Sequence, residues 1–470
     1  MNTIVLSRQL ALAAALAPAL SLPAQELTAT ERARIDSAAV AILASTGAPS
    51  ASIAIVRGGQ IVYENAYGDA RISPRTPAST SMRYAIGSVS KQFTAAAIML
   101  LVQDGKLSLD DRVSKWHPQL TRAGDVTIRQ LLSMTSGYQD YWPQDFVFTD
   151  MQRPATSDAI LRRWAGKDLD FAPGSRWQYS NTNYVLAADI VERVSGTPFM
   201  EFLTRRVFTP LAMTVADFDA GPLRASDAEA LLRNALGPLR PAPKEGKGWL
   251  FGAGQLAMSA RDLARWNISM MNRTLLAPES YRAMQLDMAL EDGTRTGYGL
   301  GLSISAPGGR RRLAHGGAVS GYTTTNWVYP DDRVAITVFT NIYPGAAGAT
   351  GQIASRIASV LFSPATAAAS DTAITAQARR IYEGLMKGAI DRSLFTRNAN
   401  DYFTPQVLTD YATSLGPLGA PTEFTAQGSS LRGGMTIRSY RIRASGVLMD
   451  LTTMTLPDGK IEQYIVARAG

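Results

Sequence analysis

The sequence predicts an α+β fold in which one antiparallel sheet, flanked by helices, is assembled from the two ends of a domain. Near the start, residues 51–56 and 60–67 are expected to form two strands joined at Gly58-Gly59, which is typical of a β-hairpin. Helical spacing fills the middle of the chain, and the pattern then changes to a period of two, with strands expected at residues 298–304, 312–315, 325–329 and 333–342. The helices between the two groups of strands are expected to form a separate, all-helical lobe.

The helix signals are local and explicit. Thr28-Ala29-Thr30-Glu31 matches a capping box, and Ile35 and Ala39 follow at helical spacing. Other helices are expected at residues 94–101, 127–134, 157–165, 183–195, 260–271 and 350–361. Residues 215–250 have little pattern and are expected to connect helices over the surface.

A second, smaller unit is predicted at the C-terminus. The small and polar residues 363–372 are typical of a linker, so the main domain should span residues 25–362. Residues 373–470 contain two helical patterns followed by alternating segments, enough for a small α+β accessory domain. We find no catalytic pattern in this part of the sequence, and its role stays open.

Residues 1–24 resemble an export signal. Arg8 gives a positive start, and the apolar run from Leu10 to Leu22 is too short to span a bilayer comfortably. The chain is therefore expected to be exported by a bacterium, to the periplasm or beyond, although an uncleaved anchor is an alternative. No later stretch of sequence is long and apolar enough for a membrane helix.

Composition excludes several kinds of chemistry. The chain has no cysteine and two histidines, His117 and His315, so disulfides, thiolate catalysis and a three-histidine metal site are all excluded. The net charge is +8, but the arginines are scattered and form no basic stripe with aromatic residues, which argues against nucleic-acid binding. The sequence thus predicts chemistry without a metal or cofactor.

The segment around Ser88 combines a nucleophile with a base. An apolar helix follows this serine, and Lys91 lies three residues later, which places both side chains on one helix face. Among the lysines, Lys91 alone has a serine at that spacing. The alternative interpretation is a helix cap followed by a solvated lysine.

Three motifs that lie far apart in the sequence favour the interpretation of Ser88 and Lys91 as nucleophile and base. Ser88-x-x-Lys91, Tyr179-x-Asn181 and His315-Gly316-Gly317 occur in an order and spacing that resemble the serine β-lactamase and penicillin-binding fold. The branch that looks most similar contains class C β-lactamases, D-alanyl-D-alanine carboxypeptidases, D-aminopeptidases and related esterases. The resemblance covers about residues 30–362 and extends to the flanking words at residues 86–88, 131–137, 173–174, 179–184, 261–264 and 298–301.

The resemblance implies a set of roles. Ser88 would attack a carbonyl and form an acyl-enzyme, Lys91 would act as its base when neutral, and Tyr179 would relay protons. Asn181 and His315 would bind the substrate. Gly316 and Gly317 would let the substrate lie along the strand, and the N–H groups of Ser88 and Ala318 would form the oxyanion hole.

Two residues depart from the family pattern. Met134 stands where the family often has a histidine, and His315 replaces the usual lysine of the third motif, which removes a permanent positive charge. Hydrolysis of D-amino-acid-containing peptides or small esters is therefore predicted ahead of efficient β-lactam hydrolysis. A β-lactamase of modest activity and a non-catalytic binding or sensor protein are the alternatives. A Ser–His–acid triad is disfavoured because the sequence contains no G-x-S-x-G motif. The sequence does not predict the oligomeric state.

Overall fold

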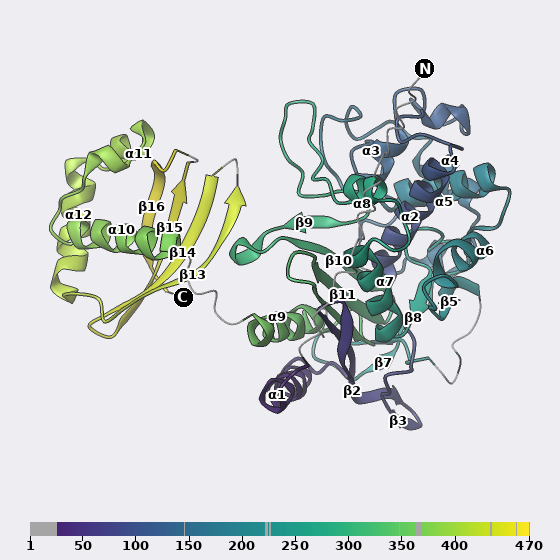
Figure 1. Ribbon diagram of the computed structural model, residues 1–470, viewed down its shortest axis with the longest axis horizontal. Helices are drawn as coiled ribbons and strands as arrows, with labels where there is room; N and C mark the ends of the chain where they lie inside the picture. Colours follow the sequence, from purple (N-terminus) through teal and green to yellow (C-terminus); the bar gives the residue numbers. More distant parts are fainter. Residues whose placement is uncertain are drawn as a thin grey trace, which may run out of the picture.

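The computed structural model describes residues 26–144, 146–220, 224, 227–346, 348–362, 369–432, 435–456 and 458–469. A seven-stranded antiparallel sheet runs through its larger part, with the strand order β3-β2-β1-β12-β11-β10-β9 (Figure 1). Its strands are β1 (Ser50–Arg57), β2 (Gln60–Ile72), β3 (Arg75–Pro77), β9 (Ser303–Ser305), β10 (Arg312–Val319), β11 (Tyr322–Tyr329) and β12 (Val334–Thr340). The early strand β1 pairs with the late strand β12, so the sheet is built from both ends of the domain, as the sequence predicts.

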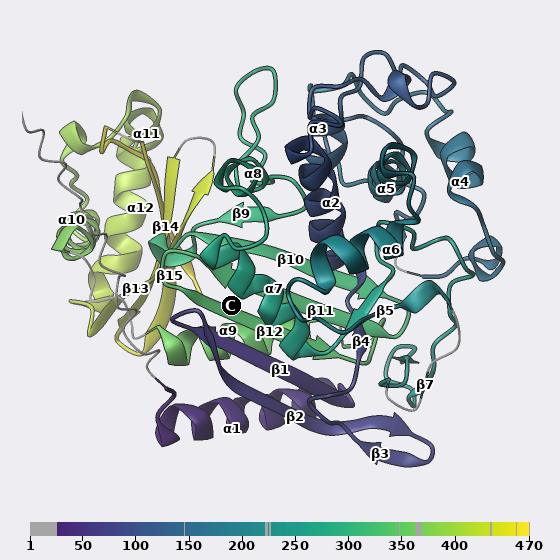
Figure 2. The ribbon, with the colours of Figure 1, turned by 45° about the vertical axis from the view of Figure 1, so that its right-hand side comes forward.

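Helices cover the two faces of this sheet. On one face lie α1 (Ala29–Thr46), which has the predicted capping box, and α9 (Ala349–Leu361), while α7 (Ala260–Asn272) lies on the other face (Figure 2). Alternate residues of β1 serve the two faces: Ile53 packs into the core under α1 and α9, whereas Ala54 belongs to the core shared with the helical lobe. Burial on both faces explains why β1 is apolar without interruption from Ile53 to Val56.

The middle of the chain forms the predicted helical lobe. Its helices are α2 (Lys91–Gln103), α3 (Ile128–Leu132), α4 (Ser157–Trp164), α5 (Asn181–Ser195), α6 (Phe199–Leu203) and α8 (Pro278–Met284). Helix α2 is buried from Lys91 to Leu101 and packs against α5. A helix that is apolar all round belongs in the centre of a lobe, and α2 occupies that position.

Two sequence expectations differ from the structure. The strand expected at residues 298–304 shortens to β9, because the N–H groups of Leu300 and Gly301 donate to the carbonyls of Met284 and Leu132 in the helical lobe. Residues 215–250 include the short strands β5 (Val215–Asp217), β6 (Leu231–Leu232) and β7 (Arg240–Pro241). Strand β5 joins β4 (Tyr84–Ala85) and β8 (Leu256–Met258) in a small sheet next to the helical lobe.

The C-terminal region has a fold and a core of its own. Helices α10 (Ala369–Leu385), α11 (Arg397–Tyr402) and α12 (Pro405–Leu415) precede an antiparallel sheet of β13 (Glu423–Arg432), β14 (Met435–Ala444), β15 (Val447–Thr455) and β16 (Ile461–Arg468). Tyr382, Tyr440 and Leu451 are buried between helices and sheet. Strand β13 lies beside the turn Pro307–Gly309 of the main domain (Figure 1). The α+β prediction for this region is confirmed.

Parts of the predicted domain organisation lie beyond the described residues. The predicted export signal falls outside them, as does most of the linker, so the division of the chain at residues 363–372 stays a prediction. No helix in the described ranges has both the length and the apolar character that a membrane crossing requires.

Candidate active site

Ser88 lies in a tight turn that leads directly into helix α2. The turn is the 3₁₀ segment Gly87–Ser90, and the α-helix begins at Lys91. Gly87 has a φ of +50°, and a Cβ at this position would come within 2.8 Å of the Ala318 nitrogen. The glycine therefore lets the turn approach strand β10 closely. Ser88 accepts no capping bond there, and Lys91 is fully buried, so the interpretation as a cap with a solvated lysine is wrong.

The Lys91 ammonium nitrogen has three oxygen partners. Its Nζ lies 3.0 Å from Ser88 Oγ, 2.8 Å from Asn181 Oδ1 and 2.9 Å from the carbonyl oxygen of Ala253. Burial lowers the pKa of Lys91 to about 7, although the charge of Asp140 opposes this shift. A substantial fraction of this amine is therefore neutral near pH 7, and the neutral form can accept a proton.

Asp140 is the site residue that the sequence analysis did not identify. Its Oδ1 accepts bonds from the backbone N–H of Asn181 at 2.9 Å and from Asn181 Nδ2 at 3.1 Å. Because the amide nitrogen of Asn181 points to this carboxylate, its oxygen must face Lys91. Burial raises the pKa of Asp140. One signal was available in the sequence: residues 138–149 are rich in aromatic residues and proline, which fits either a loop at the rim of a cleft or a packed surface loop. In the structure, residues 140–144 of this segment line the cleft.

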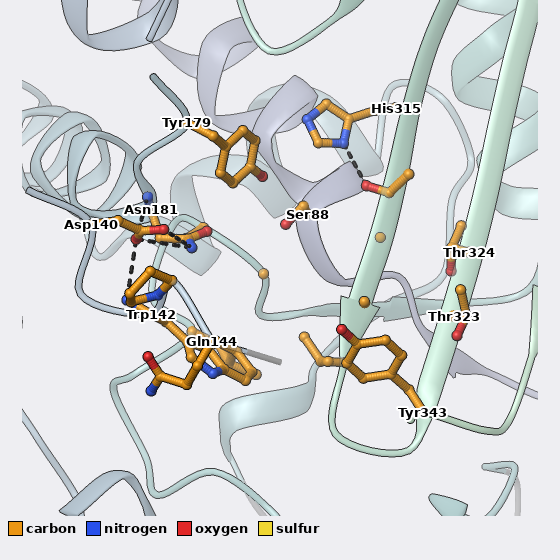
Figure 3. A pocket seen from close by; sticks show the side chains of 18 of the residues that line it. Ser88, Asp140, Trp142, Gln144, Tyr179, Asn181, His315, Thr323, Thr324 and Tyr343 are labelled. Carbon is orange, nitrogen blue, oxygen red and sulfur yellow. Dashed lines mark hydrogen bonds between the residues drawn. The ribbon is translucent and has the colours of Figure 1, made fainter. Parts of the chain in front are cut away.

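Tyr179 precedes helix α5 and faces the serine. Figure 3 shows its ring between Asn181 and His315, with the phenol directed towards Ser88. Burial raises the pKa of Tyr179, and the Ser88 hydroxyl offsets part of that rise, so the group is a neutral phenol at physiological pH. Apart from the neighbouring Ser88 hydroxyl, its own hydroxyl has no hydrogen-bond partner among the described residues, so it can bond a substrate atom at this site.

His315 lies on β10 beside the same cleft, and both of its ring nitrogens are engaged. Nδ1 is 2.5 Å from the carbonyl of Gly316, which can only accept, so Nδ1 carries the proton. Nε2 then accepts from the Tyr298 hydroxyl at 2.9 Å. Burial, reinforced by the charge of Lys91, lowers the pKa of His315 to about 4. This histidine is therefore neutral at physiological pH.

The remaining predicted residues form a bare strand edge. Strand β9 pairs with β10 only over Arg312–Ala314, so within the described residues no strand covers that edge of Gly316, Gly317 and Ala318. A Cβ on Gly317 would lie 1.9 Å from the Ile86 carbonyl, next to the Ser88 nitrogen. The glycine thus permits the approach that brings the Ser88 and Ala318 nitrogens to one place. All eight predicted residues lie at one site, and seven of them, all but the buried Lys91, line the cleft of about 780 Å³.

Met134 supports the segment that carries Tyr179. Its sulfur accepts from the Ser180 N–H at 3.4 Å and from Asn183 Nδ2 at 3.7 Å, in a backbone conformation with a φ of +63°. The departure from the family pattern at this position is therefore a packing and positioning contact. Across the described ranges, no three His, Asp or Glu side chains gather as metal ligands.

A serine and a buried lysine on one helical turn, beneath the free edge of an antiparallel sheet, define the penicillin-recognising class of serine hydrolase folds. The Beta-lactamase family model matches residues 35–358, and the chain belongs to this family. The predicted family is confirmed.

Known proteins resemble the chain over different lengths. A D-aminopeptidase of Brucella anthropi is 28% identical over 302 residues, which cover 63% of this chain and 57% of that protein. The chain thus spans little more than half the length of this relative. The D-amino acid amidase of Ochrobactrum anthropi SV3 in complex with L-phenylalanine amide has a TM-score of 0.62 at 21% identity, covering 71% of this chain and 99% of its own.

A second solved structure extends the similarity of fold to most of the chain. The octameric penicillin-binding protein homologue from Pyrococcus abyssi has a TM-score of 0.63 at 21% identity. The match covers 93% of this chain and 96% of the homologue. It therefore includes much of the region after residue 362.

Proposed function

We propose that this protein hydrolyses amide bonds of D-amino-acid-containing peptides or amides through an acyl-enzyme formed on Ser88. The observation that carries the proposal is the buried Lys91 amine, 3.0 Å from Ser88 Oγ, with its pKa lowered to about 7. A serine hydroxyl needs a base to become an effective nucleophile, and a base works best when its pKa lies near the working pH.

The number of protons on Lys91 fits this role. A neutral amine has two N–H bonds and one lone pair. The acceptors Asn181 Oδ1 and Ala253 O take the two N–H bonds, which leaves the lone pair for the Ser88 hydroxyl proton. We infer that Asp140, by fixing the Asn181 amide, also fixes the direction of that lone pair.

The acylation step then follows from the other groups. Ser88 Oγ attacks the carbonyl carbon and passes its proton to Lys91, while the N–H groups of Ser88 and Ala318 stabilise the negative oxygen. Tyr179, a neutral phenol next to Ser88, gives a proton to the departing nitrogen and receives a proton in turn from Lys91. In the second step the same groups activate the water that releases the acyl product.

Substrate binding falls to the cleft walls. The free edge of β10 at Gly316 and Gly317 can pair with an extended substrate as an added strand. Asn181 contributes its amide near the scissile bond. His315 is neutral and engaged with Tyr298 and Gly316, so it offers no permanent charge for a carboxylate and instead holds the strand and Tyr298 in position.

The choice of substrate rests on the relatives and on this charge pattern. Relatives carry the names D-aminopeptidase and D-amino acid amidase, which supports D-configured amides ahead of esters or β-lactams. We also propose export, on the strength of the signal-like residues 1–24. N-terminal sequencing of protein isolated from the producing cells should find a chain that starts near residue 25, whereas a start at Met1 would contradict export with cleavage.

The direct test is covalent labelling followed by a substrate panel. A fluorophosphonate should add one phosphonyl mass to the protein and none to Ser88→Ala; labelling that persists in this variant would overturn the proposal. Purified enzyme is then compared on D- and L-amino acid amides, D-peptides, small esters and nitrocefin. Tight binding without turnover of any substrate would favour a binding or sensor protein.

A further inference from the structure

The catalytic cleft does not end at the strand edge. Beyond Ala318 it reaches the opposite face of the sheet, where Thr323, Thr325 and Thr350 line it at the first turn of α9. A second hollow of about 780 Å³ lies between α1 and α9, over Trp327. Figure 2 shows these two helices side by side on this face of the sheet.

Two glycines join the hollows. Gly348 and Gly351, at the start of α9, line both. A Cβ added at Gly351 would have no heavy atom within 4 Å, so the space above it is open and the glycine is not required for folding. Gly348 is nearly as open, with a side-chain nitrogen of Gln352 as its nearest neighbour at 3.5 Å. Because neither residue has a side chain to separate the hollows, we infer that an extended ligand can pass from one to the other along a single groove.

The charges along the groove are placed at its two ends. Among the described residues that line the catalytic cleft, Asp140 is the one with a formally charged side chain, and it lies beside Asn181 at the catalytic end. Arg356 lines the far hollow, is exposed, and has no ion-pair partner among the described residues. The free positive charge of Arg356 attracts a peptide carboxylate towards the far end.

From these features we propose that the substrates are oligopeptides. Their residues after the scissile bond would pass over Gly348 and Gly351, the saddle between the two hollows, towards Arg356. The inference rests on the proposed function and adds the place where the part of a peptide after the scissile bond is held. Thr350 and Arg356 are six residues apart on one helix, which is about 9 Å. An extended peptide covers that distance in about three residues.

The first experiment blocks the saddle. Peptides with a D-residue before the scissile bond are lengthened one residue at a time on the C-terminal side, up to about eight. For the natural enzyme, kcat/KM should rise on the order of tenfold while the added residues pass Thr350 and cover the last three or so residue lengths to Arg356, and should then level off. Gly351→Trp should abolish that gain, whereas Gly351→Ala, which adds only a methyl group in the same open space, should retain it.

The second experiment tests the charge at the far end. With the shortest extension that reaches the level rate, the free acid should be a better substrate than the C-terminal amide by about threefold, the effect of one exposed charge pair. Arg356→Gln should remove this difference and Arg356→Glu should reverse it. Arg34→Gln, on the exposed surface of α1 and outside both hollows, is the matched control and should leave it unchanged.

A D-amino acid amide without any extension separates the two proposals. If Ser88 hydrolyses this reporter in every groove variant but kcat/KM is independent of peptide length, or is equally length-dependent in Gly351→Trp, the groove proposal is wrong and the proposed function stands. If the reporter and all peptides are hydrolysed equally well by Ser88→Ala, the proposed function itself fails.

Discussion

The two walls of the cleft are built on different principles. On the helical wall, side chains supply the chemistry, and Lys91, Asn181 and Asp140 form one chain of hydrogen bonds that reaches Ser88. On the strand wall, the backbone offers most of the contacts to a substrate, because no neighbouring strand of the described residues covers the edge of Gly316, Gly317 and Ala318. The reactivity of Ser88 therefore depends on the side chains around it, whereas binding of an extended substrate depends on glycines that leave the strand edge open.

The sharpest way to test the comparison is to remove the reacting groups of the helical wall. Ser88→Ala and Lys91→Met should each reduce kcat/KM for a D-amino acid amide by on the order of 10⁴ or more, since nucleophile and base act as one unit. Lys91 is fully buried at the start of α2, so thermal unfolding is measured beside the kinetics. Folded Lys91→Met protein with activity within tenfold of the natural enzyme would show that another group is the base.

The strand wall should respond to one added methyl group. In Gly317→Ala the new Cβ would meet the Ile86 carbonyl at 1.9 Å, which must push β10 away from Ser88 and open the oxyanion site. A loss of about 10² in kcat is expected, the effect of misplacing one donor.

The matched variant for this test is Gly316→Ala. The nearest heavy atom to a Cβ at Gly316 is 3.8 Å away, so the same methyl group causes no clash there and the loss should be much smaller. Equal losses in the two variants would argue against a specific approach of β10 to the Ser88 turn.

A pH profile examines the link between Asp140 and the base. Lys91 acts when neutral, so kcat/KM should fall about tenfold per pH unit below its pKa of about 7 and be level above it. The charge of Asp140 raises that pKa, and therefore Asp140→Asn should move the acid limb to lower pH. The level rate should also drop, by about 10- to 100-fold, because the Asn181 amide loses its anchor. An acid limb that stays in place or moves to higher pH would contradict this coupling.

The sequence predicts more of the helical wall than of the strand wall. Ser88, Lys91, Tyr179 and Asn181 are chemically distinctive at fixed spacings, and the structure brings all four together. Asp140 could not be predicted in this way, because a single acidic residue in a loop belongs to no motif of fixed spacing. Its contact with Asn181 joins residues that are 41 positions apart in the chain.

The same limit applies to the strands. Alternation predicts β10 and β11, but it cannot show that residues 298–302 turn away to bond the helical lobe, because these hydrogen bonds join distant segments. Nor does it indicate that the cleft continues over α9. There the decisive features are glycines, and Gly348 and Gly351 do not stand out in a sequence until the helix around them is placed.

His315 lies on the strand wall and contacts Tyr298, and its replacement should have the smallest effect on kcat/KM of the variants considered. The imidazole contacts Tyr298 and the Gly316 carbonyl, while its pKa of about 4 keeps it from acting as a cation at neutral pH. His315→Gln, which retains a donor and an acceptor, should therefore lower kcat/KM by no more than about tenfold and leave the acid limb near pH 7. A loss as large as that of Ser88→Ala would instead indicate a serine–histidine mechanism. Because neutral His315 provides no charge, the substrate carboxylate must find its partner elsewhere, and the variant should show unchanged preference between peptide acids and amides.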